Sequence, residues 1–230
     1  MKMPKNSWFG QSLVAGLASV LLTSGAAADM PKDRPFAMRG VELGIDLDQF
    51  RQAPIPNDGN RYSDLQVRCS NDPPANGITV SVSAEDRADG IVECKWFSRD
   101  GLLHSSILWE HWIDIGTGKG IPTFSFIETG GRMRLFRVSF YANNEYYPGI
   151  LDALTRGYGS PSSVIEPFKT LSGSDFTSMT SVWDNGLSSI TLVQRCGHLE
   201  RYCLTYNHTA YSGLYAVLKE KRAAAAAGKI

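Results

Sequence analysis

Apolar residues recur at helical spacing in one segment of the chain, residues 144–159. The stripe consists of Tyr147, Ile150, Leu151, Leu154 and Tyr158. Positions separated by three or four residues lie on one side of an α-helix, so this pattern predicts an amphipathic helix. Asn144 is the expected N-cap, and Gly157 or Gly159 is expected to end the helix ahead of Pro161.

Two further helices are predicted from shorter signals. Asp46 with Gln49 three positions later has the form of a capping box, and Pro54 would stop the helix that follows. A last helix is predicted from Ser212 to Ala227. One side of it carries Leu214, Val217, Leu218 and Lys221. Residues 221–230 are alanine-rich and hold no apolar pattern, so we expect a flexible tail there.

Alternation of apolar and polar residues predicts strands over most of the remaining chain. The expected strands are residues 65–69, 78–83, 91–97, 163–168, 179–183, 188–195 and 202–206, with SSILWEHWIDIG, TFSFIET and RMRLFRVSFY between residues 105 and 141. Gly116 to Gly120, Gly130-Gly131 and Asp184-Asn185-Gly186 punctuate them as turns.

A helix followed by antiparallel strands occurs near residues 145–207, and a weaker version occurs near residues 40–141. This order predicts an α+β protein in which helices cover one face of an antiparallel sheet. The expected organisation is a disordered lead-in over 29–38, an N-terminal α+β half over 39–141 and a C-terminal α+β half over 142–220. The two halves then have the form of helix-plus-strands repeats.

Two sets of motifs carry a family resemblance. The segment YYPGILDALTRGYGSP, followed by VWDNGLSSITL and CLTY, resembles the helix, Tyr-Gly-x-Pro turn and strands of small exported bacterial proteins of unknown function. The segment GVELGIDLDQF resembles the helix start of folds related to the outer-membrane assembly lipoprotein BamE and to the β-lactamase inhibitor protein. Known members are largely binding, assembly or inhibitory proteins, so the resemblance implies binding without catalysis. The lipid-anchor cysteine of the assembly lipoprotein has no counterpart in this chain.

The N-terminal segment, residues 1–28, has the layout of a cleavable secretory signal. Lys2 and Lys5 precede an apolar run from Leu13 to Leu22, and Ala26-Ala27-Ala28 follows it. Cleavage is expected after Ala28. The apolar run is shorter than the roughly 20 residues that a membrane-spanning helix needs, and no later run is apolar enough. We therefore expect a soluble, periplasmic or secreted protein with no transmembrane segment.

Charge and cysteine content narrow the function further. The chain has 23 basic and 23 acidic residues without a basic cluster, which argues against nucleic-acid binding. Four cysteines in an exported chain predict a disulfide framework. Strands on either side of a short turn would pair Cys196 with Cys203, which leaves Cys69 for Cys94. A zinc site on Cys196, His198 and Cys203 is the alternative, but its spacing is unusual and it lacks a fourth ligand.

No catalytic motif is present among the histidines and serines. None of the four histidines lies in a compact metal motif, and no serine lies in a GxSxG elbow. His111 is the strongest catalytic candidate, because its alternation places it on an apolar strand face with Ile107, Trp109 and Ile113. An exported hydrolase centred on His111 is therefore the alternative function, and a partly buried histidine is the simpler interpretation.

Aromatic residues supply the preferred functional hypothesis. Tyr146 lies off the stripe of the predicted helix, and Trp112 lies on the strand face opposite Trp109, so both are expected at the surface. Exposed aromatic side chains are typical of binding surfaces. The sequence thus predicts a non-enzymatic exported protein, without metal or cofactor, that binds another protein or an envelope component through Trp112 and Tyr146. A purely structural envelope protein would have the same sequence features.

Overall fold

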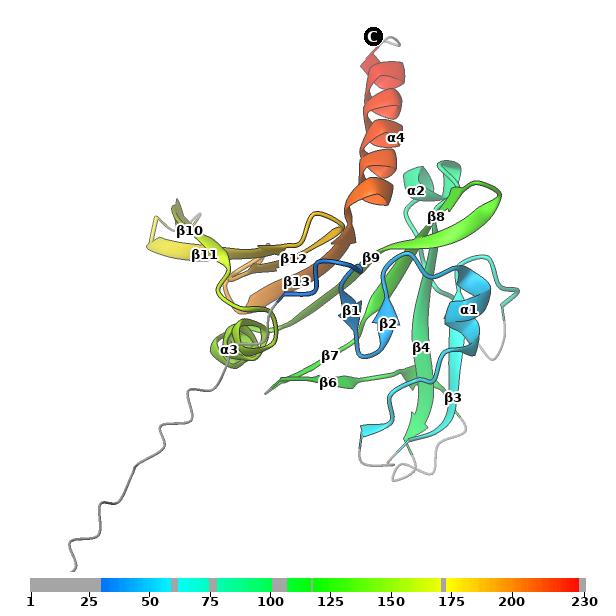
Figure 1. Ribbon diagram of the computed structural model, residues 1–230, viewed down its shortest axis with the longest axis horizontal. Helices are drawn as coiled ribbons and strands as arrows, with labels where there is room; N and C mark the ends of the chain where they lie inside the picture. Colours follow the sequence, from blue (N-terminus) through cyan, green and yellow to red (C-terminus); the bar gives the residue numbers. More distant parts are fainter. Residues whose placement is uncertain are drawn as a thin grey trace, which may run out of the picture.

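The computed structural model describes residues 30–58, 62–74, 78–100, 107–116, 118–170 and 173–227. Figure 1 shows a large sheet with β9 at its centre and a long helix, α4, that projects from one end. The predicted secretory signal and its cleavage point at Ala28 lie outside the described residues. None of the helices in the described ranges is long and apolar enough to cross a membrane.

Nine strands in the described part of the chain form one antiparallel sheet, in the order β10-β11-β12-β13-β9-β8-β4-β3 with β5 paired to β4. The strands are β3 (Tyr62–Cys69), β4 (Val92–Asp100), β5 (Trp109–Glu110), β8 (Thr123–Thr129), β9 (Arg132–Asn143), β10 (Ser162–Lys169), β11 (Asp175–Asp184), β12 (Ser188–Val193) and β13 (Arg201–His208). β9 joins the two groups of strands seen on either side of it in Figure 1.

The predicted α+β class, with helices over one face and two helix-plus-strands repeats, is wrong. The protein is mostly antiparallel β, and strands from both predicted halves belong to the same sheet. The boundary expected between residues 141 and 142 falls inside β9, which pairs with β8 on one side and β13 on the other. A local apolar pattern shows where strands occur but not which strands pair, and the pairing decides the class.

The short helix α1 (Leu47–Gln52) confirms the predicted capping box. The Asp46 side chain accepts a hydrogen bond from the Gln49 backbone N–H, and the Gln49 side chain accepts one from the Asp46 backbone N–H. Leu47 and Phe50 are buried against the sheet. A capping box satisfies two backbone donors that the first turn would otherwise leave unpaired, which explains why so short a helix begins at Leu47.

The predicted stripe of the second helix is confirmed in α3 (Tyr147–Tyr158), where Tyr147, Ile150 and Leu154 are buried. The predicted cap is displaced by one residue. Asn143, not Asn144, accepts a hydrogen bond from the Glu145 backbone N–H and begins a 3-10 turn, η2 (Asn144–Tyr146), that leads into α3. The helix ends at Gly159, whose φ of 82° lies in the region that glycine adopts without strain.

Residues 78–83, predicted as a strand, do not form one of the sheet strands. The helix α2 (Ala84–Ala88) follows directly, and Ser83 is its N-cap through a hydrogen bond from the Asp86 backbone N–H. Val80 is buried with Phe97 and Leu108 in a small separate cluster. This segment is therefore a loop that packs on β4 through its apolar residues. Its apolar and polar residues alternate as they would in a strand, which explains the wrong prediction.

The C-terminal helix α4 (Thr209–Ala227) begins three residues before the predicted start. Residues 221–227 of the expected flexible tail are helical, and residues 228–230 lie outside the described ranges. Tyr215 anchors the helix to the sheet, where it is buried with Ile91, Ile127 and Phe136. Its hydroxyl donates to Asp86 Oδ1 at 2.9 Å, and Arg222 Nη1 donates to Asp89 Oδ2 at 2.6 Å.

The expected disordered lead-in is ordered from residue 30 and contributes to the main core. Phe36 is fully buried, and its backbone N–H donates to Ser188 Oγ at 2.7 Å. The short strands β1 (Ala37–Met38) and β2 (Val41–Glu42) follow as a hairpin. This segment looks polar from its sequence, and a single aromatic residue with few neighbours was too weak a signal to predict its burial.

Both predicted disulfides are confirmed. Cys69 and Cys94 are direct cross-strand partners on β3 and β4, and both are buried. Cys196 and Cys203 close the connection between β12 and β13. Since these two cysteines are bonded to each other, the zinc alternative with His198 is excluded.

Candidate functional site

A small hairpin outside the main sheet forms one wall of a cleft. Its strands are β6 (Ile113–Ile115) and β7 (Gly118–Gly120), and the C-terminal end of β9 forms the opposite wall. The cleft has a volume of about 890 Å³, within the range of small-molecule sites. We call it the aromatic cleft, and it is lined by Trp112, Asp114, Gly116, Gly118, Lys119, Tyr141, Ala142, Asn143, Tyr146, Glu200 and Arg201.

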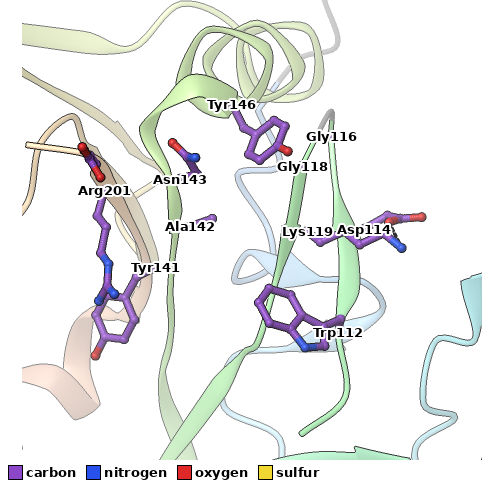
Figure 2. Close-up of a pocket in the computed structure, with 11 residues that line it drawn as sticks. Trp112, Asp114, Gly116, Gly118, Lys119, Tyr141, Ala142, Asn143, Tyr146 and Arg201 are labelled. Carbon is purple, nitrogen blue, oxygen red and sulfur yellow. Dashed lines mark ion pairs between the residues drawn. The ribbon is translucent and has the colours of Figure 1, made fainter. Parts of the chain in front are cut away.

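The structure brings the two sequence-predicted binding residues together. Trp112 precedes β6 and is 48% exposed, and Tyr146 ends η2 at the top of the cleft in Figure 2. A third aromatic side chain, Tyr141 of β9, is 63% exposed and completes the set. Three aromatic residues therefore line one cavity, although residues 112 and 146 are distant in sequence; in Figure 2 the Tyr141 ring lies beside Arg201. The binding role of these residues stays a prediction.

Tyr141 was missed by the sequence analysis. The segment RMRLFRVSFY predicts a strand with alternating core and surface positions, and Tyr141 occupies a surface position beyond Phe140. A large aromatic residue on the polar side of a strand is the signal that could have identified it. The exposure of Tyr141 also depends on the length of β8, because the pairing of β8 with β9 stops at Ser139 and does not reach Tyr141.

Gly118 fixes the position of the Tyr146 ring. A Cβ atom at residue 118 would lie 2.6 Å from Cγ of Tyr146, so only glycine permits the ring to rest against β7. The sequence suggested a turn over Gly116 to Gly120, whereas Gly118 and Gly120 belong to the strand. A hydrogen bond to Glu145 and the negative charge of that residue raise the pKa of Tyr146. Tyr146 therefore presents a neutral hydroxyl at neutral pH.

The charged groups of the aromatic cleft are balanced. Lys119 Nζ lies 3.8 Å from Asp114 Oδ1 on the hairpin wall. Glu200 and Arg201 lie on the opposite wall, at the start of β13, where Arg201 is the direct partner of Asn143. The Cys196–Cys203 disulfide closes the turn that carries Glu200 and Arg201. This arrangement offers hydrogen bonds of both polarities without a net field that would favour a strongly charged ligand.

His111, the alternative catalytic centre, is part of the interior. It is 1% exposed, its Nε2 lies 2.7 Å from the Pro56 carbonyl oxygen, and its Nδ1 lies 2.9 Å from Ser98 Oγ. A carbonyl only accepts, so Nε2 carries the proton and Nδ1 accepts from the Ser98 hydroxyl. Ser98 is itself 2% exposed. A substrate would reach this serine only if the covering residues moved.

The expected strand face around His111 is only partly present. Ile113 is buried with His111, as predicted, but Trp109 is 55% exposed. The chain leaves the strand at residues 111 and 112, between β5 and β6, so the alternation does not continue through them. Nothing in this geometry favours hydrolysis, and a catalytic role for His111 stays an untested alternative.

The environment of His111 predicts an acid-sensitive contribution to stability. Loss of solvation on burial lowers the pKa of His111, so the folded protein keeps it neutral. Below its ordinary pKa of 6.5 the unfolded chain takes up a proton that the folded chain does not. Stability that is present above this pH is therefore lost as the pH falls, by up to about 1.4 kcal/mol per pH unit.

We expect a His111→Gln variant to lose less free energy of unfolding than the wild type between pH 7 and pH 5, measured by urea denaturation. Burial also lowers the pKa of His208, but His208 is present in both proteins and cancels in the difference. Parallel pH profiles for the two proteins would show that His111 is not held neutral by the fold.

Within the described ranges, no group of three or more histidine, cysteine, aspartate or glutamate side chains is arranged to hold a metal ion. Comparison of the chain with protein families, with curated proteins and with solved structures gives no significant match. The resemblance to the BamE-like and β-lactamase-inhibitor-like folds stays a prediction. A proposal about function therefore has to rest on the geometry of the aromatic cleft.

Proposed function

We propose that this chain is an exported, non-enzymatic protein that binds another protein or an envelope component through the aromatic cleft. The observation that carries the proposal is that Trp112, Tyr141 and Tyr146 line the same cavity. Aromatic rings give a large contact area at a small cost in side-chain entropy, which is why they dominate binding hot spots. Two of the three are also strongly exposed, an arrangement that folding alone does not require.

The proposed compartment rests on the cysteines and the N-terminal sequence. Both disulfides join residues that are close in the fold, and disulfides of this kind persist in oxidising compartments. The pattern of residues 1–28 is that of a secretory signal, which would deliver the chain to such a compartment. A periplasmic location agrees with both features and would place envelope proteins within reach of the cleft.

A Trp112→Ala/Tyr146→Ala double variant is expected to bind its partner at least ten-fold more weakly than the wild type. Each ring supplies contact area to the cleft, and truncating one hot-spot aromatic residue typically costs about 2 kcal/mol or more. The measurement is a pull-down of the oxidised protein from an envelope extract under mild crosslinking, followed by titration of the retained partner.

Trp109→Ala is the matched control. Trp109 is as exposed as Trp112, at 55% and 48%, but it does not line the aromatic cleft. The control should retain the partner that the double variant loses. Equal retention by the double variant and the wild type would reject the cleft as the binding surface.

A further inference from the structure

β9 extends beyond its neighbour β8. The pairing of these two strands ends at Thr123 with Ser139, whereas β9 continues to Asn143. On its other side β9 remains paired with β13 as far as Asn143 with Arg201. Residues 140–143 therefore have one paired side, and among the described residues no strand pairs with the other side, which borders the aromatic cleft.

Two hydrogen bonds establish which backbone groups point toward this unpaired side. The Asn144 N–H donates to the Glu200 carbonyl at 2.8 Å, and the Cys196 N–H donates to the Arg201 carbonyl at 2.9 Å. In an antiparallel ladder the direction of these groups alternates along a strand. Ala142 thus pairs with β13, and the N–H and C=O of Tyr141 and the N–H of Asn143 point away from it. The C=O of Asn143, as the N-cap of η2, belongs to that turn.

The outward groups of Tyr141 have no hydrogen-bond partner within the part of the chain that the structure describes. An unpaired strand edge is a template for another extended chain, and proteins usually cover or block such edges. At the end of the sheet, β10 carries Pro167, which has no N–H to offer. Residues 141–143 include no proline, and the β6–β7 hairpin, which carries Asp114 and Lys119, faces this edge across the aromatic cleft without pairing to it.

We propose that the ligand of the aromatic cleft is an extended segment of a partner protein that adds as a strand to β9 at Tyr141–Asn143. This inference rests on the proposed function of the cleft. Backbone hydrogen bonds to Tyr141 and Asn143 would set the direction and register of the segment. Trp112, Tyr141 and Tyr146 would contact its side chains. This mode of recognition takes affinity from the main chain and selectivity from the surrounding side chains.

The charges of the cleft define the chemistry of the segment. Lys119 lies beside Asp114, and Arg201 follows Glu200, so neither wall presents a single sign of charge. A strongly acidic or basic peptide gains nothing from such walls. Side chains alternate across a strand, so apolar or aromatic residues at every second position would face the three rings.

The test begins with linear heptapeptides displayed as a random library. Peptides are selected on the oxidised wild-type protein and depleted on the Trp112→Ala/Tyr146→Ala variant, so that those kept depend on the cleft. Each selected peptide is then methylated at one backbone nitrogen at a time, which removes a donor without changing a side chain. We expect affinity to fall at least ten-fold at alternate positions and to change little at the positions between them.

Variants of Tyr141 test the same hydrogen bonds from the protein side. Tyr141→Pro and Tyr141→Val both remove the ring, but only proline also removes the N–H that points into the cleft. That N–H takes no part in the pairing with β13, so proline is compatible with the sheet. We expect Tyr141→Pro to bind at least ten-fold more weakly than Tyr141→Val. Circular dichroism establishes that both variants are folded, and if proline prevents folding the methylation scan decides alone.

The outcomes separate this inference from the proposed function. Peptides that need Trp112 and Tyr146 but show no alternation on methylation would overturn strand addition and leave a cleft that binds side chains. Failure to select any cleft-dependent peptide would also overturn strand addition. The proposed function is rejected by a separate result: the partner from the envelope extract binds the double variant as tightly as it binds the wild type.

Discussion

Replacing Cys69 and Cys94 together with alanine is expected to lower the free energy of unfolding by about 3.5 kcal/mol, because the bridge spans 25 residues and closing a loop of that length restricts the unfolded chain. The bridge joins β3 to β4 on the side of the sheet farthest from β13. Urea denaturation of the oxidised wild type and the double variant measures the difference. The slope of the transition should also increase, because an unfolded chain without the bridge exposes more surface.

The Cys196→Ala/Cys203→Ala variant is the comparison. Its loop has a sequence separation of 7, for which the same chain-entropy relation gives about 2.5 kcal/mol. The longer loop should therefore show the larger loss. Equal losses for the two variants, or a larger loss for the shorter loop, would mean that native-state contacts outweigh chain entropy at these bridges.

Local features of the fold could be predicted because their signals lie within a few residues. The Asp46 capping box needs only Gln49, three positions away. The tight turn between β11 and β12 follows from Asp184-Asn185-Gly186, where Gly186 has a φ of 84° and Asn185 Oδ1 accepts from the Ser188 backbone N–H. The Cys196–Cys203 pairing came from the same kind of short-range reasoning.

The sheet itself could not be predicted, because its pairings join distant segments. β3 pairs with β4 and lies at the edge of the sheet. β9 pairs with β13, from which it is separated in sequence by α3 and three strands, and Phe36 donates a hydrogen bond to Ser188. Each of these contacts depends on many residues at once. The α+β expectation gave most weight to the one strong helical stripe, whereas the weaker alternating segments determine the architecture.

The aromatic cleft could be predicted from the sequence only in part. Trp112 and Tyr146 were identified because each departs from its local apolar pattern. That they share a cavity with Tyr141 follows from the placement of the β6–β7 hairpin beside the end of β9. The unpaired edge at Tyr141 could not be seen in the sequence at all, because it exists only where β8 stops and β13 continues.

Phe50→Ala is expected to have the largest effect on stability of any change considered, a loss of about 3–5 kcal/mol in the free energy of unfolding. Phe50 of α1 is fully buried, and its ring centroid lies 4.5 Å from that of Phe124 and 5.2 Å from that of Phe126. The side chain therefore connects a six-residue helix to the centre of the sheet. Truncation would leave a cavity that the paired strands β4 and β8 cannot close without disturbing their register.

Phe168→Ala is the matched control for this change. Phe168 lies on the edge strand β10, where its ring stacks on Phe176 at 5.9 Å and is half-buried. Loss of that single aromatic contact should cost about 1 kcal/mol. Urea denaturation of both variants compares them directly. Similar losses at the two positions would contradict a core centred on β4, β8 and α1, because in that architecture the centre of the sheet must be far more sensitive to truncation than its edge.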